Sequence, residues 1–304
     1  MNISNNTKEQ IINLAINEYL STPEMERSLT KLGEKYGIKR QTLSKHLKAR
    51  GIQVINYQNI ARLNENAFDS MDNEEQFYWL GFMYADGCIS KTGNRIEVYL
   101  SLSDISHLEK FRKFLNHTTT IRTGTDKRGI QFCHLAVRNK HMWNTLNNLG
   151  CVPCKTLILE FPNISIFKNN FNFVTAFIRG YVDGDGCLTI YPISNSNSYR
   201  TVLKLKGQLN FLEKVNSIFK NKGHIRKCGD DNVYDLQFSD VMSRVVARVL
   251  YSKATIYLDR KYNKYLEFCR LEEESSRRLS SKIGESWDAD SEVISKIAQG
   301  LETP

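Results

Sequence analysis

Hydrophobic and polar positions follow the same succession of patterns twice between residues 74 and 270. Strict alternation predicts half-buried strands, and apolar residues every three to four positions predict amphipathic helices. The first copy predicts a strand at 95–100, a helix at 105–115, strands near 119–124 and 130–138, and a helix from about 140. The second predicts a strand near 200–206, a helix at 209–220, strands near 224–228 and 233–238, and a helix from 240. The matched order predicts a tandem duplication.

Each copy opens with a related short motif, WLGFMYADG at 79–87 and IRGYVDGDG at 178–186. Gly81 and Gly180 hold the same place in the two motifs. Glycine inside a helix costs about 1 kcal/mol relative to alanine, so packing must compensate for it. Another small residue, Ala85 or Gly184, follows four positions later on the same helical face. We therefore expect the two motif helices to pack against each other almost backbone to backbone.

This packing would bring Asp86 and Asp185 side by side at the two helix C-termini. A carboxylate there faces the unfavourable end of the helix dipole, and a second carboxylate adds repulsion. A divalent cation between them would remove both penalties and could catalyse phosphodiester hydrolysis. The alternative is that both aspartates only cap helices at the surface. The matched register of the two copies favours the metal site.

Capping residues are also expected at the ends of the motif helices. Asp72 with Glu75 predicts a capping box before the first motif. Gly87 and Gly186 follow the two aspartates, and a glycine in the left-handed conformation commonly ends a helix.

Residues 7–52, ahead of the duplication, are expected to be helical and separate from it. The segment from Leu29 to Lys48 fits a helix-turn-helix, with Gly33 and Gly37 at the positions that need a small residue and a turn. Leu32, Tyr36, Ile38 and Leu43 fill the apolar places between its helices. The second helix presents candidate DNA contacts, namely Lys39, Arg40, Gln41, Thr42 and Lys45. The alternative is an ordinary two-helix hairpin with a solvated charged face.

Composition narrows the class of protein. The net charge of +9 favours a polyanionic partner, and 41% hydrophobic residues argue against wholesale disorder. No apolar run approaches the roughly 18 residues of a membrane span, and the N-terminus lacks the apolar segment of a signal peptide. Seven scattered cysteines predict reduced, mostly buried thiols in a cytoplasmic, nucleoid-associated protein.

The two motifs resemble the LAGLIDADG motif of homing endonucleases over roughly residues 74–270. The resemblance implies an α+β fold of tandem pseudo-twofold αββαββα repeats, a monomeric saddle whose curved sheets lie in the major groove of double-stranded DNA. It implies Mg²⁺ bound at Asp86 and Asp185, with Ala85 and Gly184 in the same metal site. It also implies cleavage of both strands across the minor groove, leaving short 3′ overhangs. The first acid place of the motif holds Asp183 in one copy but Tyr84 in the other, and little catalytic loss is expected from that departure.

The resemblance also implies supporting residues. A lysine near each scissile phosphate is assigned to Lys155 and Lys261, with Lys253 as a fallback. A polar residue at the end of each second strand is assigned to Asp104 and Gln208, although Asp104 could instead be an N-cap. DNA contacts are expected from the outward strand faces, through Arg95, Tyr99, Arg122 and Arg138 in the first half and Arg200, Lys204, Lys206 and Arg226 in the second.

The domains expected are a helix-turn-helix at 1–55, a linker at 56–73, repeats at 74–165 and 166–270, and a charged tail at 271–304. The terminal residues predict a freestanding or intron-encoded endonuclease rather than an intein. One alternative keeps the scaffold but not the cleavage, as a group I intron RNA maturase that binds intron RNA or as an inactive DNA-binding regulator. Another is a helix-turn-helix regulator with a ligand-sensing domain, which predicts a pocket and no acid pair.

Overall fold

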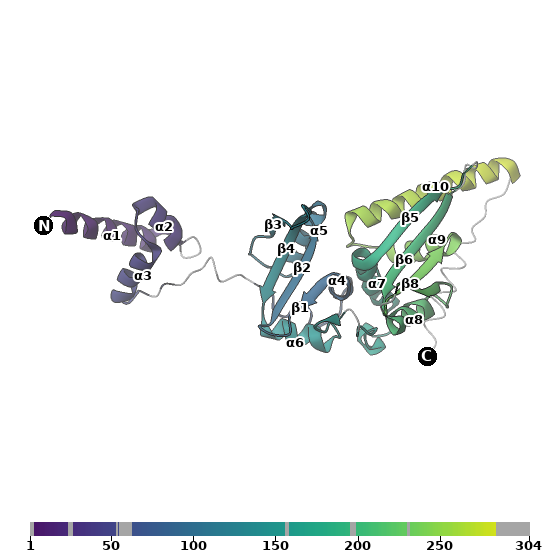
Figure 1. Cartoon of the computed structure of the whole chain (residues 1–304), viewed down its shortest axis with the longest axis horizontal. Helices are drawn as coiled ribbons and strands as arrows, with labels where there is room; N and C mark the ends of the chain where they lie inside the picture. Colours follow the sequence, from purple (N-terminus) through teal and green to yellow (C-terminus); the bar gives the residue numbers. More distant parts are fainter. Residues whose placement is uncertain are drawn as a thin grey trace. The chain divides into compact units, whose positions relative to one another are not determined.

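The computed structural model describes residues 3–23, 27–52, 54, 63–155, 158–194, 199–229 and 232–283. The chain divides into two compact units, residues 1–63 with 116–119 and residues 64–115 with 120–304 (Figure 1). Residues 56–62 of the expected linker lie outside the described residues, as does the expected tail from 284 onward. No described helix is long and apolar enough to cross a membrane.

The described part of the N-terminal unit contains the helices α1 (Ile3–Ser21), α2 (Leu29–Tyr36) and α3 (Arg40–Ala49). Gly37 joins α2 to α3 with φ of 65°, in the left-handed region that favours glycine. A Cβ on Gly33 would lie 2.5 Å from the Ile38 carbonyl oxygen, so the turn can close only over a glycine. The core of this unit is a cluster of side chains from all three helices, namely Ile12, Ala15, Ile16, Tyr19, Leu29, Leu32, Leu43 and Leu47.

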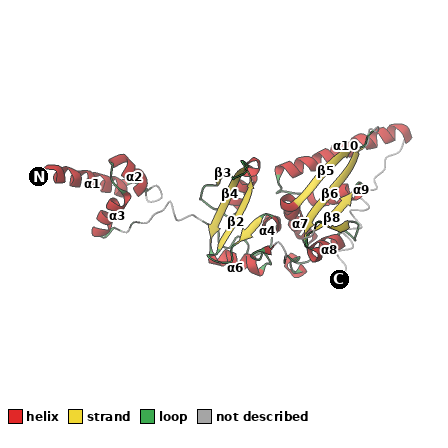
Figure 2. Ribbon diagram, viewed as in Figure 1, coloured by secondary structure: helices red, strands yellow, loops and turns green. Residues whose placement is uncertain are grey.

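The larger unit contains the predicted duplication, seen as two separate yellow sheets with red helices in Figure 2. The first repeat comprises α4 (Glu74–Ala85), β1 (Gly87–Ile89), β2 (Arg95–Ser101), the 3₁₀ turn η3 (Leu102–Asp104), α5 (Ile105–Phe114), β3 (Arg122–Thr125), β4 (Gln131–Arg138) and α6 (Lys140–Asn148). After the 3₁₀ turn η5 (Ile164–Phe167), the second comprises α7 (Phe171–Asp185), β5 (Gly186–Pro192), β6 (Tyr199–Gly207), α8 (Leu209–Ile218), β7 (His224–Lys227), β8 (Tyr234–Ser239) and α9 (Val241–Tyr251), and α10 (Asp259–Ile283) follows. The tandem αββαββα order is confirmed.

The two sheets have the same antiparallel topology, with strand orders β1-β2-β4-β3 and β5-β6-β8-β7. The predicted alternation is seen in β2, where Ile96 and Val98 are buried while Tyr99 is exposed. The strands β1 and β5 directly follow the motif helices. Sequence periodicity did not locate either of them: three residues in β1 are too few to show alternation, and β5 buries only Leu188 among its seven residues.

The two motif helices, α4 and α7, make the closest contact between the repeats. A Cβ on Gly81 would lie 1.9 Å from the Phe177 carbonyl oxygen, and one on Gly180 would lie 2.0 Å from the Tyr78 carbonyl oxygen. No side chain fits in either space. The backbones therefore meet directly, as the paired small residues predicted, and α4 and α7 lie between the two sheets in Figure 1.

The caps of the motif helices differ from the prediction. Asn73, not Asp72, is the N-cap of α4, and its side chain accepts a hydrogen bond from the Gln76 N–H at 3.0 Å. Gly87 and Gly186 are not left-handed, because each passes directly into a strand instead of a turn. Their small size matters for a different reason. A Cβ on Gly186 would lie 2.5 Å from the Val182 carbonyl oxygen.

The cysteines also correct the prediction, because most of them are not buried. Only Cys133 and Cys151 are buried, while Cys88, Cys154 and Cys187 are exposed, and none of the seven forms a disulfide. Cys88 and Cys187 each follow a motif glycine, and strand alternation carries them to the solvent side of the sheets.

Replacing Gly81 with alanine tests the close crossing. An alanine in an ordinary helix position stabilises by about 1 kcal/mol over glycine. Here the added methyl group would push against the α7 backbone, so Gly81→Ala should destabilise by on the order of 3 kcal/mol in urea unfolding. Asn172→Ala, exposed in the first turn of α7, is the control and should change little. A Gly81→Ala protein as stable as the wild type would contradict the crossing.

Candidate active site

The helix crossing brings the two motif aspartates into one place. Asp86 caps the end of α4, and Asp185 is the last residue of α7. The Asp86 carboxylate lies against the end of the other helix, since its Oδ2 would be 3.3 Å from a Cβ on Gly184. Ala85 and Gly184 lie against each other beside the carboxylates, so that a Cβ on Gly184 would be 2.4 Å from the Ala85 Cβ. Alanine and glycine here let the two carboxylates approach.

The surroundings of both carboxyl groups favour the protonated, neutral form over the charged form. Burial raises the pKa of Asp86 to about 6, and the neighbouring charge of Asp185 adds to this. Burial also raises the pKa of Asp185. The positive charges of Lys155 and Lys261 oppose both shifts. Burial therefore disfavours the negative charges of both carboxylates, and a bound cation would neutralise them.

Lys155 and Lys261 occupy matching places around this pair. Lys155 Nζ donates to the Met83 carbonyl oxygen at 2.9 Å and to that of Gly87. Lys261 Nζ donates to the Val182 carbonyl oxygen at 3.4 Å and to that of Gly186. These carbonyls hold the fifth and ninth places of the two motifs. Each ammonium thus binds one carbonyl in the last turn of a motif helix and one at the first residue of the strand that follows, where the helix dipole favours a cation.

The departure at the first acid place has a structural explanation. The buried Asp183 carboxylate accepts a hydrogen bond from the Leu258 N–H at 2.7 Å, just ahead of the lysine of its repeat. Tyr84, in the equivalent place, donates from Oη to the Leu149 carbonyl oxygen at 2.6 Å, in the segment ahead of the other lysine. Either residue therefore ties its motif helix to the segment that carries the lysine. Two buried hydroxyls, from Tyr78 and Tyr251, complete the partners of Asp183.

The residues at this centre fit a hard divalent cation such as Mg²⁺. Mg²⁺ prefers oxygen ligands and commonly binds one or two carboxylates together with water and substrate phosphates. Asp86 and Asp185 provide two carboxylates, and both gain from a cation because burial disfavours their charge. The described residues contain no group of three or more His, Cys, Asp or Glu side chains suited to a metal. Any further ligands would therefore come from water or from a bound substrate.

The structure places Asp104 and Gln208 at different positions in their repeats. Val98 pairs with Gly87 as Leu205 pairs with Gly186, so the strand register makes Ser101 the counterpart of Gln208. Asp104 lies beyond the strand, in η3, because the first repeat has this extra turn before its helix. Its side chain does not cap α5.

Each of these two side chains has a partner that periodicity did not predict. The Asp104 carboxylate pairs with Arg260, whose Nε lies 3.2 and 3.0 Å from the two oxygens. In the sequence, only its position directly before Lys261 could have indicated that Arg260 lies near the site. Gln208 Nε2 donates to the Asn232 carbonyl oxygen at 2.8 Å.

The strand pairing brings all eight predicted contact residues of the sheets onto solvent faces. In the first sheet, Arg95 pairs with Arg138, and Tyr99 and Arg122 both pair with His134. Paired residues share a face, so these side chains lie together. In the second sheet the same register groups Arg200, Lys204, Lys206 and Arg226 on the face opposite the buried Leu203 and Leu205.

The face of the first sheet also contains polar residues that periodicity did not single out. Glu97 accepts from Arg95 at 2.7 Å and lies 3.1 Å from His134. The His134 ring stacks on Tyr99 with centroids 3.8 Å apart. Tyr99 remains half exposed, so its hydroxyl and ring edge can face a ligand. Contacts among Glu97, Tyr99 and His134 therefore hold this polar stripe in place.

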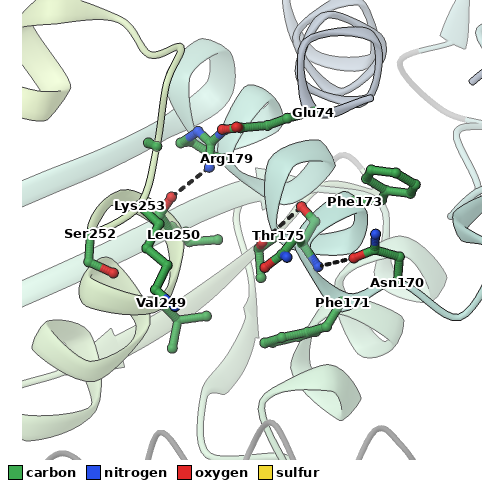
Figure 3. A pocket seen from close by; sticks show the side chains of 12 residues that line it. Glu74, Asn170, Phe171, Phe173, Thr175, Arg179, Val249, Leu250, Ser252 and Lys253 are labelled. Carbon is green, nitrogen blue, oxygen red and sulfur yellow. Dashed lines mark hydrogen bonds and ion pairs between the residues drawn. The ribbon is translucent and has the colours of Figure 1, made fainter. Parts of the chain in front are cut away.

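The fallback Lys253 does not lie at this centre. It lines a cavity of about 420 Å³ beside Glu74 and Asn170, at the N-terminal ends of α4 and α7 (Figure 3). The aspartates lie at the opposite ends of these helices. The buried Arg179 in this cavity donates to the Leu250 and Ile256 carbonyl oxygens, at 2.8 and 2.9 Å, and its cation therefore has a structural role.

No family model and no curated protein sequence matches this chain. Among solved structures, it is similar to the LAGLIDADG meganuclease I-AabMI bound to uncleaved DNA, with a TM-score of 0.46 and 14% identity over 77% of this chain and 100% of that chain. It is also similar to the meganuclease I-SmaMI bound to an uncleavable DNA, with a TM-score of 0.45 and 13% identity over 76% and 97% of the two chains. A third match is the LAGLIDADG homing endonuclease I-GzeII in complex with its DNA target, with a TM-score of 0.41 and 14% identity over 76% and 98%.

Proposed function

We propose that this chain is a LAGLIDADG-type homing endonuclease, which hydrolyses both strands of a long, asymmetric DNA site and leaves short 3′ overhangs. One observation carries the proposal. Two helices cross at glycine contact and end in a buried pair of aspartates, with one lysine bound to each helix end. A structural cap needs no second aspartate and no matched lysine.

Asp86 and Asp185 would hold Mg²⁺ at the centre between the two repeats. When bound there, the ion would stabilise negative charge on the attacking and leaving oxygens. In the reaction, the oxygen of a water molecule bonds to phosphorus while one P–O ester bond breaks. The departing oxygen takes up a proton and leaves as a hydroxyl.

The two lysines would act on the phosphate and on the attacking water. An ammonium has three N–H groups, and two backbone carbonyls, one in the motif helix and one in the strand after it, accept two of them in each repeat. A third can face a phosphate oxygen. Burial lowers the pKa of Lys261, and the positive charge of Arg260 lowers it further. Both effects bring the pKa of this amine closer to the range in which it exchanges protons.

The sheet faces and the N-terminal unit would hold the duplex. Cationic side chains on the second sheet are suited to phosphates, and the Tyr99 and Glu97 stripe on the first sheet is suited to base edges. In the N-terminal unit, α3 presents a hollow of about 770 Å³ lined by Lys39, Arg40, Gln41, Ser44, Lys45 and Lys48, while Thr42 is half-buried beside it. We propose that this helix extends the DNA footprint as a helix-turn-helix.

Cleavage of a randomised duplex library with Mg²⁺ tests the proposal. The wild type should make double-strand breaks at one long site. Asp86→Asn and Asp185→Asn should bind that site but cut at least about 100-fold more slowly, because the charge that holds the ion is gone. Asp72→Asn, exposed ahead of α4, should cut normally. Tight binding of one duplex or intron RNA without any cleavage would make the chain a binder or a maturase on this scaffold.

The raised pKa of Asp86 predicts how stability varies with pH in metal-free protein. The folded state holds this proton up to about pH 6, whereas an unfolded aspartate loses it near pH 3.8. Folding stability therefore falls as pH rises between these values, by on the order of 3 kcal/mol. Asp86→Asn should remove the loss, so in EDTA its advantage over the wild type in urea unfolding should grow between about pH 4 and pH 8. An advantage that is equal at both pH values would contradict the burial of this charge.

Salt dependence tests the role of α3. Lys39→Gln with Lys45→Gln removes two exposed charges, so binding to the selected duplex should weaken and the slope against log salt should fall by about 2. Lys8→Gln with Lys31→Gln, which removes two exposed charges from α1 and α2, is the control. Equal slopes in the two double variants would refute a specific contact by α3.

A further inference from the structure

Arg260 is held beside the proposed centre by a residue of the other repeat. It lies in the first turn of α10, directly before Lys261. Its Nε lies 3.2 and 3.0 Å from the two oxygens of Asp104, in the first repeat. The Asp104 side chain is only 9% exposed, whereas that of Arg260 is 52% exposed. A buried carboxylate thus orients a half-exposed guanidinium.

The way Arg260 is held leaves its outer edge available. A guanidinium has five N–H groups in one plane, one on Nε and four on the two terminal nitrogens. Among the described residues, all the hydrogen bonds of Arg260 are made through Nε to Asp104. The two terminal nitrogens form the fork that binds two oxygens of a phosphate. Because Asp104 fixes the plane of the group, less side-chain entropy is lost when a phosphate binds.

The charge of Arg260 acts on the centre itself. Burial raises the pKa of Asp86, and the positive charge of Arg260 is among the charges that oppose this effect. Burial lowers the pKa of Lys261, and Arg260 is the next largest cause. Arg260 therefore lies within electrostatic reach of both residues.

The first repeat has no counterpart of this arrangement. Cys154 precedes Lys155 in the place that Arg260 holds before Lys261. It is exposed, uncharged and in the left-handed region with φ of 55°. The residue directly before α8 is not acidic either: Gln208 is neutral, and its amide donates to the Asn232 carbonyl oxygen. The anchored cation therefore stands beside only one of the two lysines.

We propose that Arg260 binds the phosphodiester of one DNA strand and that this strand is cut first. The inference rests on the proposed function, because it concerns the same hydrolysis at the same centre. A guanidinium that bridges two phosphate oxygens stabilises the charge that builds there as water adds and the ester bond breaks. The other strand has a lysine but no such fork, so its cleavage is slower and a nicked duplex accumulates.

Single-turnover cleavage of the selected duplex, with each strand end-labelled in turn, tests this inference. In the wild type one strand should be cut faster than the other. Arg260→Gln should slow that strand by on the order of 100-fold and leave the rate of the other strand unchanged. Asp104→Asn keeps the arginine but removes its anchor, and should slow the same strand by a smaller factor. Lys264→Gln, one turn further along α10, is the matched control for lost charge and should leave both rates unchanged.

The outcomes separate this inference from the proposed function. If the wild type cuts neither strand of any duplex, the proposed function fails, and the role of Arg260 fails with it. If the wild type cuts both strands and Arg260→Gln slows both equally or neither, the proposed function stands and the inference is wrong. Thermal unfolding and duplex binding with Ca²⁺ in place of Mg²⁺ show whether the variant is folded and still binds. If Arg260→Gln does not fold, Arg260→Lys replaces it in the test. Lysine keeps the charge but not the two terminal nitrogens of the guanidinium, so this variant should still slow only one strand.

Discussion

The contact between α4 and α7 is the constraint on which the rest of the larger unit depends. Glycines at the crossing let the two backbones touch, and this contact determines where both helices end. The ends carry Asp86 and Asp185, so two residues that are far apart in the chain form one acidic centre. The same ends offer carbonyl oxygens to Lys155 and Lys261. Packing, electrostatics and the proposed chemistry thus follow from the absence of two side chains.

The duplicated architecture need not be chemically symmetric. Tyr84 and Asp183 differ in charge, yet each ties its motif helix to the segment ahead of a lysine. Elsewhere the difference changes the chemistry, because Arg260 and Asp104 place an anchored cation at one side of the centre only. A single chain allows this divergence, since each half can be altered without the other. It also suits an asymmetric duplex, whose two strands differ.

The repeated motif made much of this arrangement predictable from the sequence. Two glycines at one register predicted the crossing, and two aspartates at one register predicted the acidic centre. The ion pair of Arg260 with Asp104 was not predictable, because it joins residues from different repeats and depends on the extra turn η3. The predicted N-cap of α4 was wrong by one residue, since Asn73 caps the helix. The predicted left-handed conformation of Gly87 and Gly186 was also wrong, because local signals cannot distinguish a turn from a strand that begins directly after the helix. The outward placement of Arg95, Lys204 and Lys206 followed from alternation, because they oppose apolar faces.

Asp86 and Asp185 are proposed to act as one cation site, which electron paramagnetic resonance of Mn²⁺, titrated into the complex with the selected duplex, can test. The wild type should bind Mn²⁺ tightly, and Asp86→Asn and Asp185→Asn should each abolish this binding even though each leaves the other carboxylate in place. A variant of either residue that binds Mn²⁺ as tightly as the wild type would show that the two carboxylates do not share an ion.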